Sequence, residues 1–198
     1  MRALALACTF ATAIALLVSG CETAPKSTEQ RAALETEVQA AIRVAKDTDP
    51  GLQRFFDTAA GYAVFPEVGK GAFVAGGAFG RGILFEGGRP TGYCSLTQAS
   101  VGAAVGGQKY TEIIFFETPD AVSRFKAGDY TFAAQASAVA LKSGASSNAK
   151  YADNVLAFTM GEAGLMVEAA IGGQRFSFEP FAATAPGIER AIYRTAPQ

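Results

Sequence analysis

The sequence contains no histidine and no tryptophan among its 198 residues. The absence of histidine removes the commonest general base and the commonest zinc ligand, together with the Ser-His-Asp and Cys-His arrangements of nucleophilic catalysis. The acidic residues are scattered singly, and no spacing singles out a catalytic pair. The sequence therefore argues against an enzyme, and it predicts neither a cofactor nor a metal.

An excess of positive charge is also missing. The chain has 17 basic and 18 acidic residues, which gives a formal net charge of −1. Nucleic-acid binding depends on clustered basic residues. We therefore expect no nucleic-acid partner.

Cysteine is scarce, and two of the three cysteines lie near the start of the chain, at Cys8 and Cys21. Arg2 precedes an uncharged apolar stretch over 3–18, which is typical of a bacterial secretion signal. The small residues directly before Cys21 resemble the lipobox of bacterial lipoproteins, in which that cysteine is acylated and becomes the mature N-terminus. An ordinary cleaved signal and an uncleaved membrane anchor are the alternatives.

This interpretation divides the chain into a signal peptide (1–20), a tether (21–28), a single folded domain (29–185) and a C-terminal tail (186–198). Cys94 is then left without an intramolecular disulfide partner. Glu22 is not the aspartate that favours retention at the inner membrane in enteric bacteria. We therefore expect a lipid anchor in the cell envelope, at the outer membrane and facing the periplasm.

Helical patterns follow the tether. Ser27 and Gln30 have the spacing of a capping box, and apolar residues then recur at helical spacing over about 28–47. The segment 49–51 (Asp-Pro-Gly) ends this helix, and a second short helix is expected to end at Gly61.

From Gly61 the pattern changes to short β-forming segments rich in glycine. Thirteen of the 22 glycines fall between Gly61 and Gly107. Because glycine has no Cβ, it permits bulges and close approach of neighbouring strands. The fold class is therefore α+β, with a curved antiparallel sheet or partial barrel flanked by N-terminal helices. The expected strands are 62–65 (stopped by Pro66), 71–79, 81–86, 91–96, 130–141 and 151–160, with a turn at 87–88 and a helix over 118–128.

One seven-residue pattern occurs twice, at 104–110 and at 170–176. Each copy contains a Gly-Gly pair, then glutamine, a cation and an aromatic residue. This arrangement predicts two hairpins or bulges, each leading into a strand.

The glycine spacing at 102–107 resembles a phosphate-binding loop, but Gln108 stands where a nucleotide-binding loop requires lysine. We therefore expect no nucleotide. Five cations lie near the predicted turns: Lys70, Arg81, Arg89, Lys109 and Arg175. They are either solvated turn residues or, if they converge, a site for phosphate head groups.

Three segments resemble the SYLF domain, a lipid-binding family: 63–85 (AVFPEVGKGAFVAGGAFGRGILF), 101–137 (VGAAVGGQKYTEIIFFETPDAVSRFKAGDYTFAAQAS) and 164–180 (GLMVEAAIGGQRFSFEP). They occur in the family's order, and the resemblance covers roughly 35–180. It implies binding to phospholipid membranes through an N-terminal amphipathic helix and basic residues. The matching elements are the helix from Ser27 to Asp47 and, in the glycine-rich motif, Lys70 and Arg81. With Lys109 and Arg175, these two cations are the candidates for head-group binding.

The predicted helix departs from that expectation because acidic residues balance its cations, so it has no strong cationic face. Three functions stay open. The first is a non-enzymatic phospholipid-binding domain of an envelope lipoprotein. The second is a lipid-anchored structural module that docks onto an envelope protein. The third is an enzyme acting on lipid or peptidoglycan, which would require clustering of carboxylates such as Glu86, Glu112 and Asp153.

Overall fold

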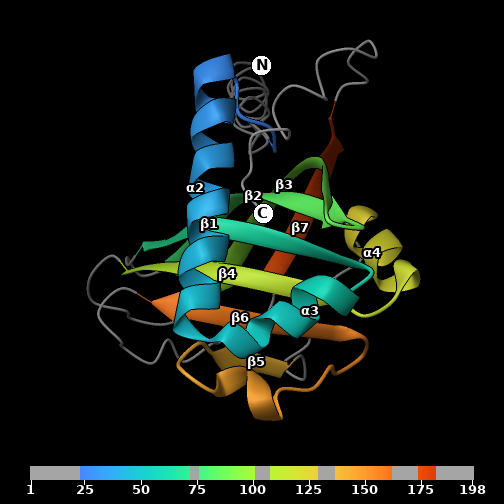
Figure 1. The fold of residues 1–198 in the computed structure, drawn as a ribbon. Helices are drawn as coiled ribbons and strands as arrows, with labels where there is room; N and C mark the ends of the chain where they lie inside the picture. Colours follow the sequence, from blue (N-terminus) through green and yellow to red (C-terminus); the bar gives the residue numbers. More distant parts are fainter. Residues whose placement is uncertain (1–22, 72–75, 101–107, 129–136, 162–173, 182–198) are drawn as a thin grey trace, which may run out of the picture.

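The computed structural model describes residues 23–71, 76–100, 108–128, 137–161 and 174–181 (Figure 1). The signal peptide, Cys21, both Gly-Gly pairs of the repeat and the C-terminal tail lie outside these residues. The helical elements are α2 (Thr28–Thr48), the 3-10 turn η1 (Pro50–Leu52), α3 (Gln53–Thr58), α4 (Pro119–Lys126) and the 3-10 turn η2 (Ala145–Asn148). The strands are β1 (Gly61–Gly71), β2 (Gly76–Glu86), β3 (Arg89–Ser100), β4 (Gln108–Phe116), β5 (Ser137–Ala140), β6 (Val155–Gly161) and β7 (Gln174–Pro180).

The strands form one sheet in the order β5-β6-β4-β1-β2-β3-β7. The predicted α+β class is confirmed. As expected, the pairs are antiparallel, with the exception of the edge pair β5 and β6, which is parallel. The sheet is strongly curved. Its curvature is evident from the hydrogen bond between Gln174 on β7 and Glu112 on β4, because three strands separate β7 from β4 in the sheet order.

The first strand continues through Pro66, where the sequence predicted its end. The register of β1 shifts between Val64 and Glu67, which is a bulge, and a proline is tolerated in a strand where a bulge interrupts the ladder. Opposite this bulge, a Cβ added at Gly82 would lie 2.3 Å from the carbonyl oxygen of Val64. The expected strands 71–79 and 81–86 are one strand, β2, in the described residues, because the glycines around Arg81 accommodate the bulge without ending the strand.

Alternate residues of the strands build a core on each face of the sheet. One face, here called the α4 face, packs against α4 through Val122 and Phe125. The other, the α2 face, packs against α2 and α3 through residues such as Val38 and Phe55. Figure 1 shows α2 crossing the strands of this face.

Local sequence signals predicted the positions of α2 and α4 correctly. The Ser27–Gln30 capping box is present at the start of α2, and Thr118 caps α4, which has Pro119 in its first turn. After α2 the buried Asp49 accepts hydrogen bonds from the backbone N–H of Gly51, at 3.0 Å, and of Ser146, at 2.6 Å. These bonds tie the end of α2 to η2, across 97 residues of sequence.

The remaining predictions concern one turn and two strands. The turn at 87–88 is confirmed, and both glycines have positive φ. The strand that follows runs to Ser100 rather than to residue 96. Of the expected strand 130–141, β5 occupies only 137–140 in the described part of the chain. Within the described ranges, no helix is long and apolar enough to cross a bilayer.

Candidate functional site

Three of the predicted head-group residues lie on the α2 face of the sheet. Lys109 on β4 is in register with Gly69, and Arg175 on β7 is in register with Thr97. Gly69 and Thr97 are both in register with Phe79 on β2, so Lys109 and Arg175 occupy the same row across the sheet.

Arg81 lies on the same face, one pleat along β2 from that row. Its neighbours across the ladder are Glu67 on β1 and Ser95 on β3. Neighbouring strands lie about 4.8 Å apart, so the strand of Arg81 is about 10 Å from that of Lys109 and about 10 Å from that of Arg175. The structure thus brings three cations onto one end of one face, but not into a single charge cluster.

The other two cations, Arg89 and Lys70, are not placed with these three by the structure. Arg89 lies at the start of β3, in register with Glu86, at the opposite end of the sheet. The backbone of Lys70 lies next to Gly69 in β1, in register with Ala78. The side chain of Lys70 lies outside the described part of the structure.

The cations have partners on this face. Lys109 forms an ion pair with Glu67 at 2.9 Å, and both side chains are more than half exposed. Exposed pairs of this kind contribute little to stability, typically below about 1 kcal/mol. The guanidinium of Arg81 lies 5.1 Å from the centre of the Phe79 ring. Because the Lys109–Glu67 ion pair contributes little to stability, it can rearrange at a small cost in free energy when a ligand approaches.

A groove of about 420 Å³ lies between the N-terminal half of α2 and the ends of β1 and β2. We call this cavity the α2 groove. Its helix side includes Ala33, Leu34 and Glu37, and its sheet side includes Glu67, Phe79 and Arg81. Its volume falls in the range of small-ligand pockets.

The segment before α2 runs along the same face. The hydroxyl of Thr23 lies 3.5 Å from that of Ser95 on β3, and Ala24 is buried. Pro25 lines the α2 groove, and its carbonyl accepts a hydrogen bond from Nε of Arg31 at 3.0 Å. The tether therefore meets the domain beside Arg81.

The helix cations are partly directed at aromatic rings of the domain itself. Arg31 lies 5.7 Å from the ring centre of Tyr93, and Lys46 lies 4.6 Å from that of Phe56. Burial and the nearby Glu35 raise the pKa of Tyr93. These contacts agree with the absence of a strong cationic face on this helix.

A second polar group is buried on the α4 face, inside the curl of the sheet. The carboxylate of Glu112 is fully buried and accepts a hydrogen bond from Nε2 of Gln174 at 3.1 Å. Burial, followed by the charge of Glu112, raises the pKa of Tyr110 well above its usual value.

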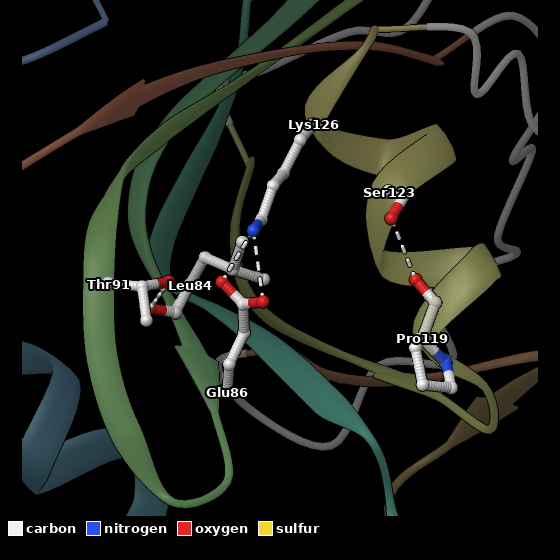
Figure 2. A network of polar contacts seen from close by, with 6 residues as sticks. All are labelled: Leu84, Glu86, Thr91, Pro119, Ser123 and Lys126. Atoms are coloured by element: carbon white, nitrogen blue, oxygen red, sulfur yellow. Dashed lines mark hydrogen bonds and ion pairs between the residues drawn. The ribbon is translucent and has the colours of Figure 1, made fainter.

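The three carboxylates named as possible catalytic residues have different partners. Glu86 pairs with Lys126 of α4 at 2.7 Å, as Figure 2 shows, and Asp153 pairs with Arg124 at 3.1 Å. Glu112 instead contacts Gln174. Within the described ranges, no group of three histidine, cysteine or acidic residues is placed to hold a metal ion.

Two residues of the α2 groove were not predicted from the sequence. Glu37 resembles any exposed acid of an amphipathic helix, and Phe79 resembles a core residue of a strand. They meet because α2 crosses the end of the sheet, which neither local pattern encodes. The alternation of Phe79 and Arg81 along β2 was the available signal that both side chains point to one face.

Comparison with known proteins gives one similarity. The chain is 30% identical over 151 residues to a protein named Beta cell expansion factor A from Aeromonas veronii. The similarity covers 75% of this chain but 57% of that protein, so the chain spans little more than half the length of its relative. No protein-family model matches the chain.

Proposed function

We propose that this chain belongs to the SYLF family and is a non-enzymatic, phospholipid-binding lipoprotein of the bacterial envelope. The three segments that carry the resemblance contribute β1 and β2 (63–85), β4 and α4 (101–137) and β7 (164–180). Three of these elements, β4, β1 and β2, are the central strands of the sheet. The resemblance therefore concerns the body of the domain and not one isolated loop.

The observation that carries the proposal is the shared face of Arg81, Lys109 and Arg175. Along the sheet, the strand of Arg81 is about 10 Å from that of Lys109 and about 10 Å from that of Arg175, and the last two are about 19 Å apart, so one phosphate cannot contact all three cations. Separated cations on one face suit an array of head groups, as on a bilayer surface.

The predicted anchor supports the same orientation. Cys21 precedes Thr23 by two residues, and a chain spans at most about 3.6 Å per residue. Thr23 contacts Ser95, which is in register with Arg81. An acylated Cys21 would then attach the protein to a membrane within about 7 Å of this face.

The anchor and the domain would have separate roles. One acyl chain holds a protein only marginally at a bilayer, whereas two or more hold it stably. The modification at Cys21 would supply residence at the membrane, and the α2 face would add recognition of head groups. Replacing Cys21 with serine is expected to abolish incorporation of radiolabelled palmitate in cells and to release the protein from the outer-membrane fraction. Unchanged palmitate incorporation in the serine variant would contradict the anchor.

Head-group recognition is tested by co-sedimentation with vesicles. A soluble form beginning at Glu22 retains every described residue. It is mixed with neutral and with anionic vesicles, at low and at high salt. We expect sedimentation with anionic vesicles that weakens in high salt, because exposed charges are screened beyond about 10 Å at 0.1 M salt.

The charge-reversed variants Arg81→Glu, Lys109→Glu and Arg175→Glu are expected to sediment less than the unchanged protein. Arg89→Glu is the matched control, because it makes the same charge change at the other end of the sheet. Equal loss with Arg89→Glu would show that only net charge matters. Absence of binding to any vesicle would contradict the proposal and favour a lipid-anchored structural or protein-interaction module.

A further inference from the structure

The α2 groove contains charges of both signs. Arg81 and Glu67 line its sheet side, while Glu37 lines its helix side. Glu67 is paired with Lys109 at 2.9 Å, at the margin of the groove. Glu37 is exposed on α2, where solvent or a ligand can reach its carboxylate.

These charges restrict the ligand that fits. A purely anionic group would meet the repulsion of Glu37 and Glu67 when it approached Arg81, and a purely cationic group would meet that of Arg81. A ligand with both charges can place its anion at the guanidinium and its cation at a carboxylate. Guanidinium groups bind phosphate through two parallel hydrogen bonds, and carboxylates accept hydrogen bonds from ammonium.

Apart from Gln30, the remaining residues that line the groove are apolar or glycine. Leu34 and Ala33 lie on the helix side, and Pro66 and Phe79 lie on the sheet side. Such walls exclude water from part of the groove and can pack against carbon atoms of a ligand. Gly69 has open space at its Cβ position, with only a backbone oxygen at 4.0 Å, so the strand adds no side chain that would fill the groove.

We infer that the α2 groove recognises a phosphodiester that carries a primary ammonium, the chemistry of a phosphoethanolamine head group. Arg81 contacts the phosphate, Glu37 accepts hydrogen bonds from the ammonium, and the apolar walls contact the carbon chain between them. This inference rests on the proposed phospholipid binding and names the head group that the site selects. It also predicts that a quaternary ammonium is a poorer ligand, because it has no N–H to donate to Glu37.

The experiment compares three vesicle compositions with the soluble form beginning at Glu22. One contains phosphatidylcholine alone, one adds phosphatidylethanolamine, and one adds the anionic phosphatidylglycerol. Soluble glycerophosphoethanolamine is titrated in parallel, which separates recognition of the head group from binding to a bilayer. A charge-assisted hydrogen bond at a partly exposed site predicts about fivefold tighter binding to the phosphatidylethanolamine vesicles than to phosphatidylcholine alone.

Single variants assign this preference to named groups. Glu37→Gln is expected to remove the preference for phosphatidylethanolamine while leaving binding to phosphatidylglycerol vesicles unchanged or stronger. Glu35→Gln makes the same change two residues away on α2 and is the matched control. Ala33→Trp fills the groove without changing charge, so it is expected to remove the preference and the binding of glycerophosphoethanolamine. Thermal unfolding of each variant verifies that it is folded.

The outcomes separate the two proposals. Binding to phosphatidylglycerol with no preference for phosphatidylethanolamine would overturn the groove inference and leave the proposed phospholipid binding intact. Binding of glycerophosphoethanolamine without binding to any vesicle would support the groove chemistry and contradict membrane binding. A preference that survives both Glu37→Gln and Ala33→Trp would overturn the assignment to this groove.

Discussion

The two ends of α2 cover the same face of the sheet in different ways. At the C-terminal end, the helix lies beside a cluster of aromatic rings in which the ring centre of Phe56 is 4.9 Å from that of Phe115 and 5.0 Å from that of Tyr62, both in edge-to-face geometry. At the N-terminal end, the helix stands over the α2 groove, where charged side chains outnumber aromatic ones.

This difference separates stability from recognition along one helix. The aromatic end excludes water and fixes α2 on the sheet, which allows the other end to stay open without loss of the fold. An open groove beside a rigid sheet is a common arrangement for a binding site, because the sheet holds its residues in place. Substitutions at the two ends should therefore have different effects on unfolding and on binding.

The largest expected effect is a loss of folding stability at the aromatic, C-terminal end of α2. Phe115 is fully buried against several rings, so Phe115→Ala should lower the free energy of unfolding by about 3–5 kcal/mol. Phe79→Ala at the open end is the matched variant, and it should cost less than half as much because Phe79 is only partly buried. Urea unfolding followed by circular dichroism measures both. Equal losses would mean that the open end is as tightly packed as the closed end.

The next effect concerns the bulge of β1. A methyl group at position 82 would meet the carbonyl of Val64, so Gly82→Ala should destabilise the domain by about 1–3 kcal/mol through overpacking. Gly69→Ala introduces the same methyl group into open space in β1, and it should change the stability by less than about 0.5 kcal/mol. The comparison fails if both alanine variants unfold at the same urea concentration.

A smaller effect is expected at the junction after α2, and it depends on pH. Burial alone would raise the pKa of Asp49, but hydrogen bonds from Ser146 and Gly51 outweigh it and hold the pKa below its ordinary value. A carboxylate with a lowered folded-state pKa stabilises the protein above its unfolded pKa of about 3.9, and this stabilisation is lost as the pH falls through the folded value.

Replacing Asp49 with asparagine should therefore cost about 1–3 kcal/mol at pH 7, since the charge-assisted bonds are lost. The difference between the two proteins should shrink as the pH falls below about 4. Parallel unfolding curves from pH 7 to pH 3 measure this effect. A constant difference across that range would show that ionisation of Asp49 does not contribute.

The smallest expected effect lies at the start of α2. Ser27→Ala removes the side chain that accepts from the N–H of Gln30 at 3.2 Å, so it should cost about 1 kcal/mol. Because this cap lies at the open end, the loss should appear as faster amide hydrogen exchange in the first turns of α2. Exchange in α3 should stay unchanged, and a uniform increase over both helices would contradict a local effect.

Local sequence signals predicted the helices. The extent of β1 and the pairing of β5 depend on contacts between residues far apart in the sequence, so they could not be predicted. The Ser27 cap and the Asp-Pro-Gly break at 49–51 act within a few residues, so they were visible in the sequence. Pro66 was misread as a strand end because its tolerance depends on glycines of β2, about 15 residues away. The parallel pairing of β5 depends on a crossover that no local pattern encodes.

The site was predicted only in part for the same reason. The cations were found from their positions near predicted turns, and the strand register places Arg81, Lys109 and Arg175 on one face. Glu37 and Phe79 were missed because 42 residues separate them and only the crossing of α2 over the sheet joins them. Lipidation of Cys21 stays a prediction from the sequence.

The most direct test of the account asks which face of the domain meets the bilayer. The form beginning at Glu22 has Cys94 as its single cysteine, and this thiol is fully buried, with its pKa raised by burial. A cysteine introduced at the exposed Ala32, next to the α2 groove but not lining it, or at the exposed Ser123 on α4, can therefore be labelled with a polarity-sensitive dye.

Vesicles containing phosphatidylethanolamine and phosphatidylglycerol are then added to each labelled protein. The account predicts a blue shift of the dye at position 32 and an unchanged spectrum at position 123. A shift at position 123 alone, or equal shifts at both positions, would contradict membrane binding through the α2 face.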